Sequence, residues 1–237
     1  MSEWQAKRFW KVSAVIEKEA GFAVALDGRE VKTPLKNALI VPTRAMADAI
    51  AAEWDAQGEQ IDPFSMPATR AANSAIEKIT PQREAVIDAL AEYGASDLIC
   101  YRADAPLELV ARQVEAWDPL LTWAREALGA ELKTVTGVMF AAQPEEALAA
   151  LRAPLVAADA FELAGLHDLI MLSSSLVIGL KAREMDDPAP LWTASRVDET
   201  YQADEWGYDE EAMEAAAEKA TAFAAAHRFY QLAQKTA

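Results

Sequence analysis

The chain contains 237 residues, of which 52% are hydrophobic and 25% are charged, and its formal net charge is -16 at pH 7. This length and apolar content are sufficient for one large domain or two small ones with a buried core. The negative charge argues against binding to nucleic acids and to anionic membrane surfaces, because both depend on clustered Lys and Arg.

The charge is unevenly distributed along the chain. Residues 1–44 contain eight Lys or Arg and five Asp or Glu, a net charge of +3, so residues 45–237 carry a net charge of -19. We therefore predict two regions of different character, with the boundary near Arg44.

The single cysteine and the first residues bear on the cellular compartment. Cys100 has no second cysteine with which to form an intramolecular disulfide, which suits a reducing compartment. Residues 1–12 lack the apolar run of a secretory signal. The most apolar segment, residues 169–180, is too short to span a bilayer and lies between Asp168 and Lys181. We therefore expect a cytoplasmic protein without membrane insertion.

The first predicted elements are the strands of a small antiparallel β unit. Extended runs lie at residues 9–17, 22–26, 29–34 and 37–42. Asp27 and Gly28 separate two of these runs, and both residue types tolerate positive φ angles, so the pair is a strong hairpin signal. Pro42 ends the last strand.

A helix is predicted to follow immediately, over residues 44–57. Thr43 is a favourable N-cap for it. Gly58 can adopt the left-handed conformation that ends many helices. The change from strand to helix spacing therefore coincides with the change in charge.

Trp54 belongs to an apolar stripe on this helix. Met46 and Ile50 precede it at four-residue intervals, which is the spacing of one helix face. We therefore expect Trp54 to pack between the helix and the β domain rather than to contact a partner. Trp54 and Arg44 are both retained as residues with a structural or a partner-binding role.

The remainder of the chain is predicted to be helical. The expected helices cover residues 68–79, 81–93, 107–128, 144–158, 159–184, 192–206 and 209–233. Pro119 should kink or divide one of them, and the β-branched residues 131–141 predict an extended segment or a loop. The predicted fold class is α+β: a small N-terminal antiparallel β domain, residues 1–44, followed by a larger all-α helical domain, residues 45–237.

Several classes of enzyme are disfavoured by motifs that the sequence lacks. Its nine glycines are scattered, so neither the dinucleotide-binding fingerprint nor the P-loop occurs. The two histidines, His167 and His227, are sixty residues apart, and no HExxH spacing is present. We expect a buried or helix-terminal structural role for His167, and we predict no metal and no cofactor.

Candidate nucleophiles also lack catalytic neighbours. Cys100 lies in the apolar sequence DLICYR without an adjacent base, which favours an inert core thiol. Ser173, Ser174 and Ser175 are not part of a GxSxG motif. Their small size favours close approach of another helix, and their hydroxyls can bond to the preceding turn. We therefore predict that the protein is not an enzyme.

An acidic segment near the C-terminus is the most unusual feature of the sequence. Eleven carboxylates lie between Asp186 and Glu218, against Arg196 as the single basic residue. A solvated helix surface, with acids at the start of the last helix, explains most of them. A divalent-cation site is a weaker alternative, because the spacing does not follow the calcium-binding loop pattern.

Aromatic residues in the same segment need a second explanation. Tyr201, Trp206 and Tyr208 stand among the carboxylates. An aromatic at a turn between helices is more often a packing wedge than a binding anchor, yet exposed aromatics rimmed by charge are typical of protein interfaces. We therefore predict an acidic surface that binds a basic protein partner. Its candidate residues are Asp198, Glu199, Tyr201, Asp204, Glu205 and Trp206.

Five motifs, in order along the chain, resemble one protein family. They are GREVKTP (28–34), ALIVPT (38–43), EWDAQGEQIDPFSMPATRAANSAI (53–76), SSSLVIGLK (173–181) and VDETYQADEWGYDEEA (197–212). Together they are similar to the mitochondrial and α-proteobacterial chaperones that assemble the F1 sector of ATP synthase by holding its α subunit.

The resemblance implies a non-enzymatic assembly factor whose partner is the unassembled F1 α subunit. Such a factor would act without ATP and would release the α subunit to the β subunit. The resemblance also places an important acidic position at Glu199, which we expect to pair with a basic group of the α subunit, supported by Asp198 and Asp204. The chain itself is expected to be monomeric.

The chain departs from the family pattern at one place. Relatives often have a His-Asp pair shortly after the WG dipeptide, where this chain has Ala212 and Met213. No role of that histidine is therefore carried over.

Two other functions stay open from the sequence alone. A carboxylate-dependent metal or small-molecule enzyme would need a concave pocket and perturbed acids. A general acidic scaffold would bind many basic proteins and would be strongly sensitive to salt.

Overall fold

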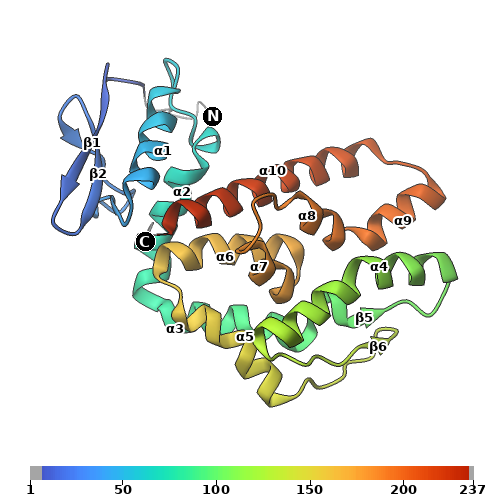
Figure 1. Ribbon diagram of the computed structural model, residues 1–237. Helices are drawn as coiled ribbons and strands as arrows, with labels where there is room; N and C mark the ends of the chain where they lie inside the picture. Colours follow the sequence, from blue (N-terminus) through green and yellow to red (C-terminus); the bar gives the residue numbers. More distant parts are fainter. Residues whose placement is uncertain (1–6, 235–237) are drawn as a thin grey trace. The chain divides into compact units, whose positions relative to one another are not determined.

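The computed structural model describes residues 7–234 (Figure 1). Its strands are β1 (Ser13–Lys18), β2 (Gly21–Leu26), β3 (Arg29–Glu30), β4 (Ile40–Val41), β5 (Tyr101–Arg102) and β6 (Val135–Thr136). Its α-helices are α1 (Arg44–Asp55), α2 (Pro67–Ser74), α3 (Arg83–Ala91), α4 (Leu107–Trp123), α5 (Glu145–Ala157), α6 (Ala160–Ser173), α7 (Leu176–Ala182), α8 (Ala189–Ser195), α9 (Val197–Trp206) and α10 (Glu210–Ala233). A small N-terminal sheet followed by helices confirms the predicted α+β fold class.

Shorter helical turns connect several of these elements. The 3-10 turns are η1 (Pro63–Ser65), η3 (Thr80–Gln82), η4 (Glu92–Ser96) and η5 (Leu98–Cys100), and the π-helical turns are η2 (Ala75–Ile79) and η6 (Ala124–Leu128). The predicted extended segment at residues 131–141 contains only β6 as a strand, which pairs in parallel with β5.

β2 is the central strand of the N-terminal sheet. It pairs antiparallel with β1 along its whole length, and its other edge pairs with β3 at one end and with β4 at the other. Asp27 and Gly28 connect β2 to β3 with φ angles of 48° and 80°. Both residues are left-handed, which confirms the predicted hairpin turn.

α1 begins where it was predicted and packs on the sheet. The Oγ1 of Thr43 accepts a hydrogen bond from the Met46 N–H over 3.1 Å, which confirms Thr43 as the N-cap. Met46, Ala47 and Ile50 are buried, and α1 contacts both β1 and β2. Full burial of a large apolar side chain such as Met46 contributes about 1.5–3 kcal/mol.

The end of α1 differs from the prediction, because Gly58 is not left-handed. The helix ends at Asp55, and the buried side chain of Gln57 completes the turn that follows. The Gln57 amide donates to the Glu53 carbonyl over 3.1 Å and accepts from the Asp62 N–H over 2.7 Å. A side-chain amide therefore does what a glycine was expected to do.

The chain divides into two compact units. The first contains the residues up to Arg83, then Asp159–Gly165 and the chain from Arg228 onward, and the second contains Glu84–Ala158 and Leu166–His227. This division differs from the predicted boundary near Arg44. The reason is that α1 and α2 group with the sheet, and that α6 and α10 each contribute residues to both units.

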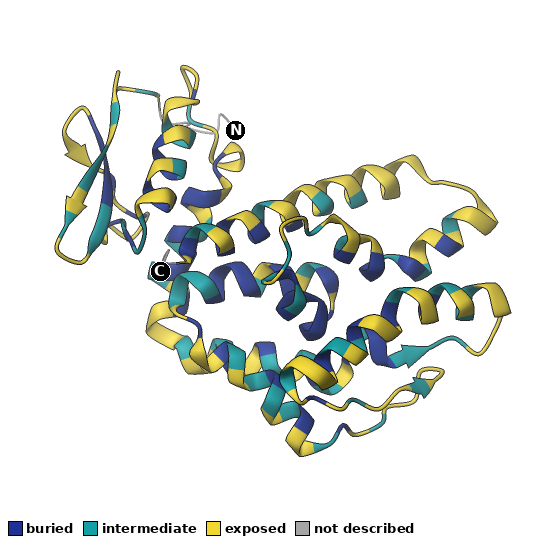
Figure 2. Cartoon of the chain, in the orientation of Figure 1, coloured by how far each residue is buried: buried dark blue, intermediate teal, exposed yellow. Residues whose placement is uncertain are grey.

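α7 lies in the core of the second unit, and it is drawn almost entirely dark blue in Figure 2. Asp97, which is fully buried, accepts hydrogen bonds from the N–H groups of Ile99 and Val177 over 3.3 and 3.0 Å. Burial raises the pKa of the Asp97 carboxyl to about 6, because the charged form loses its hydration. Asp97 therefore joins η5 to the start of α7.

The predicted single helix over residues 159–184 is wrong, because the chain turns at Ser174. Ser174 has a φ angle of 55° and separates α6 from α7. Ser175 then caps α7, since its Oγ accepts a hydrogen bond from the Ile178 N–H over 3.0 Å. A run of serines that was expected inside a helix is in fact a helix boundary.

α6 and α7, which were predicted to be one helix, pack closely against each other at Gly179. A Cβ at Gly179 would lie 2.4 Å from the Ile170 side chain, so only glycine allows this approach. The Oγ of Ser173 donates to the Leu169 carbonyl over 2.7 Å, as expected for a serine that bonds to the preceding turn. Among the described residues, no helix has the length and apolarity needed to cross a membrane.

The structure bears on two other helix predictions. Pro119 was predicted to kink or divide its helix; α4 is not divided there, although the proline costs one helical hydrogen bond. The predicted helix over residues 192–206 is divided at Arg196, whose φ and ψ angles are -114° and 16°. This break separates α8 from α9.

Candidate functional site

α9 presents the predicted acidic residues on two different faces. Asp198 and Asp204 bond to side chains of α4. Glu199, Ala203 and Trp206 line a cavity on the other side of the helix, since residues three and four apart share one helix face. The structure therefore separates Glu199 from the two aspartates that were expected to support it.

Asp198 is held by a buried glutamine of α4. The Gln113 amide donates to the Asp198 carboxylate over 2.7 Å, and its Oε1 accepts from the Ala103 N–H over 2.8 Å. Only 2% of the surface of Gln113 is exposed. Gln113 thus ties α9 and the chain that follows β5 to α4, and Asp198 contributes to this tie.

Asp204 belongs to a charged cluster at the start of α4. Arg112 donates to the Asp204 carboxylate over 2.6 Å and to Glu108 over 2.8 Å. The Tyr208 hydroxyl also donates to Asp204. The hydrogen bonds from Tyr208 and Arg112 lower the pKa of Asp204, so this carboxylate stays ionised.

Tyr201 is not one of the exposed aromatics. Only 8% of its surface is exposed, and the Arg112 guanidinium lies 5.2 Å from the centre of its ring. Burial, followed by the charge of the exposed Glu205, raises the pKa of Tyr201. Its ring is therefore part of the packing between α9 and α4.

A cavity of about 500 Å³ lies between α8, α9 and the start of α10, all in the second unit. We call it the α9–α10 groove. Its apolar lining includes Trp192, Ala203, Trp206, Met213 and Ala216. Its polar and charged lining includes Thr193, Arg196, Glu199, Thr200, Gln202, Tyr208 and Asp209. Apolar side chains beside charged ones are the combination expected of a protein-binding surface; we call the apolar lining residues the apolar floor and the charged ones the rim.

Glu199 already has a basic partner inside the groove. Arg196 donates to its carboxylate over 2.6 Å, and the Arg196 guanidinium lies 5.8 Å from the centre of the Trp192 ring. The side chain of Glu199 is 48% exposed. A basic group from another protein can therefore reach this carboxylate, but it has to share Glu199 with Arg196 or replace Arg196.

Trp206 and Tyr208 surround the turn that ends α9. Gly207 lies between them with a φ angle of 98°. Trp206 is 80% exposed and Tyr208 is 62% exposed. A packing wedge would be buried, so this exposure favours the binding-anchor interpretation of Trp206 over the wedge.

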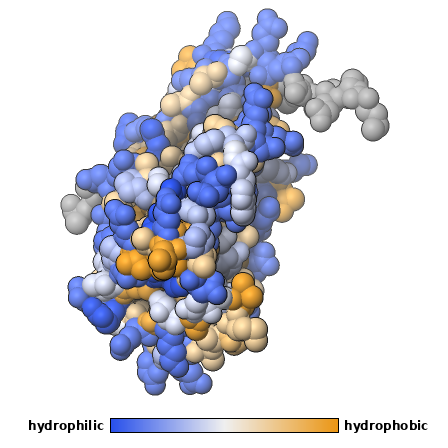
Figure 3. All heavy atoms as spheres, turned by 90° about the vertical axis from the view of Figure 1, so that its right-hand side faces the viewer, coloured by the Kyte–Doolittle hydropathy of each residue, from blue (hydrophilic) through white to orange (hydrophobic). Residues whose placement is uncertain are grey.

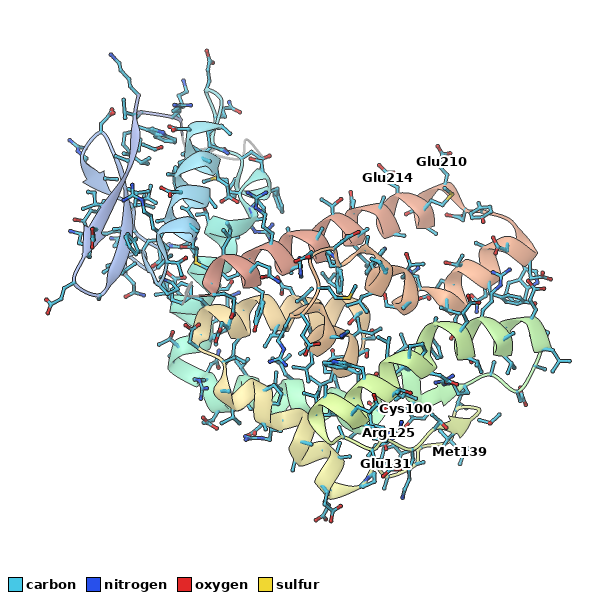
Figure 4. All side chains as sticks on the ribbon, viewed as in Figure 1. Cys100, Arg125, Glu131, Met139, Glu210 and Glu214 are labelled. Carbon is cyan, nitrogen blue, oxygen red and sulfur yellow. The ribbon has the colours of Figure 1, made fainter. Side chains whose placement is uncertain are left out.

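None of the acidic residues of α10 lines the groove. Figure 4 shows Glu210 and Glu214 on the outer side of α10, and both are exposed. Asp209 caps this helix, since its carboxylate accepts from the Ala212 N–H over 2.8 Å. The helix-terminal role predicted for these acids is consistent with this placement.

Trp54 and Arg44 lie in the first unit. The ring of Trp54 meets the ring of the buried Trp10 edge to face, with 5.2 Å between their centroids, which supports the packing interpretation of Trp54. Arg44 is exposed and pairs with Asp48 over 3.7 Å.

Cys100 is buried, and burial raises the pKa of its thiol to about 12, so it stays protonated.

His167 lies in the middle of α6 and is half-buried beside Asp168, with 2.8 Å between Nδ1 and Oδ1. The predicted buried or helix-terminal place of His167 is therefore wrong. In residues 7–234, no three His, Cys, Asp or Glu side chains are grouped so that they could hold a metal ion.

Trp192 and Met213 are groove residues that the sequence did not single out, and Arg196 was noted only as the single basic residue of the acidic segment. Trp192, Arg196, Glu199, Ala203 and Trp206 are separated by three or four residues, so helical spacing alone would have placed them together. Met213 belongs to the next helix, and its position depends on the turn at Gly207.

Comparisons with known proteins agree with the fold and the motifs. A model of the ATP12 chaperone protein family matches residues 7–125. The crystal structure of Atp12 from Paracoccus denitrificans has a TM-score of 0.94 at 47% sequence identity, over 98% of this chain and 100% of that one. The Atu1473 protein of Agrobacterium tumefaciens has a TM-score of 0.92 at 39% identity, over 96% of this chain and 86% of that one. The mitochondrial protein atp12 of Schizosaccharomyces pombe is 25% identical over 223 residues, which are 88% of this chain and 76% of that protein.

Proposed function

Because this chain belongs to the ATP12 chaperone protein family, which supports a role in ATP synthase assembly, we propose that it holds the unassembled F1 α subunit and releases it to the β subunit. The observation that carries this proposal is the α9–α10 groove, which is lined by the exposed Trp206 and other apolar residues together with Glu199. An unassembled subunit exposes apolar interface, which such a groove can cover.

The apolar floor and the acidic rim have different tasks in this proposal. Trp206, Trp192 and Met213 supply affinity by removing apolar surface from water. Glu199 supplies selectivity for a client surface that carries Lys or Arg. The client cation replaces Arg196 as the partner of Glu199, so binding exchanges one ion pair for another and leaves no buried carboxylate unpaired.

Release follows from competition rather than from catalysis. The chaperone stabilises the folded α subunit by mass action, and no nucleotide is needed for that effect. When the β subunit covers the same apolar interface of the α subunit, the chaperone is displaced. Since Glu199 then returns to Arg196, the free groove is restored to its starting arrangement.

The test is co-expression of the tagged chain with the F1 α subunit, scored for soluble α subunit and for the complex. Glu199→Lys should abolish capture without lowering the melting temperature. Glu214→Lys is the matched control, because it changes the net charge equally but lies on the outer side of α10 (Figure 4). Failure of the wild-type chain to capture the α subunit would overturn the proposal. Equal loss of α-subunit capture in both variants would indicate a general acidic scaffold instead.

A further inference from the structure

Three consecutive apolar residues stand exposed after β6. Val138, Met139 and Phe140 are 93%, 79% and 68% exposed, and Figure 4 shows Met139 beside β6. We call these three residues the apolar tip. Contiguous apolar exposure of this kind usually marks an interaction surface. The proposed groove does not explain it, because none of the three lines the groove.

The base of the loop that carries the apolar tip is fixed by hydrogen bonds. The Gln143 amide accepts from the Lys133 N–H over 2.8 Å and donates to the Lys133 carbonyl over 2.9 Å. The Gly137 N–H donates to the Arg102 carbonyl over 2.8 Å, next to the paired strands β5 and β6. The chain on both sides of the tip is therefore held, while the tip itself is presented to solvent.

The same strand that holds the tip is tied to α9. Arg102 accepts from Gly137, and the next residue, Ala103, donates to Gln113, which in turn donates to Asp198. All these residues lie in the second unit. Figure 3 faces the side of the molecule where α4, α9 and β6 end in Figure 1, and apolar side chains gather on it. The groove and the tip are thus linked through α4 by hydrogen bonds within one unit.

We propose that the apolar tip enters an apolar recess on the F1 α subunit, as a second contact beside the α9–α10 groove. This inference rests on the proposed function. A second copy of the chain is a weaker occupant, because three side chains bury at most about 500 Å², whereas a stable interface needs about 800 Å² from each partner. A membrane is weaker too, because residues 134–142 carry no charge and the chain carries -16.

Photo-crosslinking tests the contact directly. Phe140→p-benzoylphenylalanine places a photoreactive group in the tip of the complex between the full chain and the α subunit. The control is the same change at Phe64, which is 83% exposed in the first unit. Irradiation should yield an adduct with the α subunit from position 140 and none from position 64. A complex that forms normally but gives no adduct from position 140 would overturn the inference.

Affinity measurements separate the tip from the proposed function. Replacing Val138, Met139 and Phe140 by Ser should raise the Kd for the α subunit about tenfold or more, with an unchanged melting temperature. The control, Leu35→Ser with Phe64→Ser, removes exposed apolar residues elsewhere and should leave the Kd unchanged. If the wild-type chain does not bind the α subunit, both proposals fail. If it does, and the tip variant binds equally well, only the tip inference fails.

The same variants exclude the other two occupants. Tip-dependent self-association in sedimentation would point to a second copy of the chain. Tip-dependent flotation with phosphatidylcholine–phosphatidylglycerol vesicles would point to a lipid surface. Either result, without tip-dependent binding of the α subunit, contradicts the proposal.

Discussion

Single residues show how the surroundings of a carboxylate decide its task. Glu199 is half-exposed and faces the groove, whereas Asp97 is fully buried and accepts hydrogen bonds from two backbone N–H groups. A buried carboxylate without a cationic partner loses hydration that backbone hydrogen bonds only partly replace. The folded chain is therefore more stable when Asp97 is protonated.

This leads to a prediction about pH and stability. The pKa of Asp97 is raised from 3.8 to about 6 in the folded protein, so between these values the folded chain binds more protons than the unfolded chain. The contribution of Asp97 to stability is therefore full below about pH 4 and falls as the pH rises to about 6, by about 3 kcal/mol. Asp97→Asn cannot ionise and should lack this loss.

Urea unfolding of both proteins at pH 4 and pH 7 measures the effect. Other titrating groups affect both proteins alike, so the difference between their free energies of unfolding isolates the contribution of Asp97. Relative to the wild type, the free energy of unfolding of Asp97→Asn should be higher at pH 7 than at pH 4. A constant difference would mean that Asp97 titrates as it does in the unfolded chain.

Residue-scale predictions from the sequence succeeded where local chemistry decides. Thr43 caps α1 because its hydroxyl needs only a neighbouring N–H, and Asp27 and Gly28 turn because both tolerate positive φ. Tyr201 and Gly58 were misjudged because distant partners decide their surroundings. Arg112 of α4 covers the Tyr201 ring, and Gln57 replaces the glycine cap.

At the scale of elements, α9 places the residues of one acidic sequence in two environments. Its α4 side carries Asp198, which binds the buried Gln113, and its groove side carries Glu199, which faces solvent and Arg196. Neighbours in sequence point about 100° apart around a helix, so adjacent acids need not share a role. The sequence could predict the acidic helix, but the packing partner that distinguishes the two faces, Gln113 of α4, lies 85 residues before Asp198.

A pair of neutral variants should expose this division. Asp198→Asn keeps an oxygen that accepts from Gln113, so we expect capture of the α subunit to persist. Glu199→Gln removes the charge that a client cation would meet and should weaken capture about tenfold. Binding measured by calorimetry, with melting curves for both proteins, checks this. Equal weakening by the two changes would place Asp198 in the client site as well.

At the scale of the whole molecule, the negative charge lies in the long part of the chain that follows Arg44 and that contains the groove residues. Residues 45–237 carry a net charge of -19, whereas residues 1–44 carry +3. A field of one sign attracts a basic partner from a distance and is screened by salt. The apolar floor of the groove acts only at contact and is little affected by salt.

Salt should therefore change mainly the rate at which the chain and the α subunit associate. Raising the salt concentration from about 50 to about 300 mM should slow association of the α subunit roughly tenfold, with a dissociation rate that changes far less. Stopped-flow association and chase experiments measure the two rates separately. A general acidic scaffold would show the opposite balance, with dissociation accelerated strongly and many basic proteins bound at low salt.

The architecture as a whole was predictable because changes in charge and in apolar spacing coincide near Thr43. The division into two units was not, because it depends on which segments meet in space. Helical segments from three separate parts of the chain belong to the first unit. The sequence shows their apolar faces, but it does not show which of these faces pack together.

The return of the chain's last turns to the first unit has a consequence for synthesis on the ribosome. The Thr43 hydroxyl donates to the Leu232 carbonyl, and Gly165 lies so close to Tyr230 that a Cβ would be 2.8 Å from its side chain. Neither contact can form until residues 230–232 have been synthesised. The strands of the first unit therefore emerge long before the residues that complete it, and a nascent chain halted at His227 would leave this unit open.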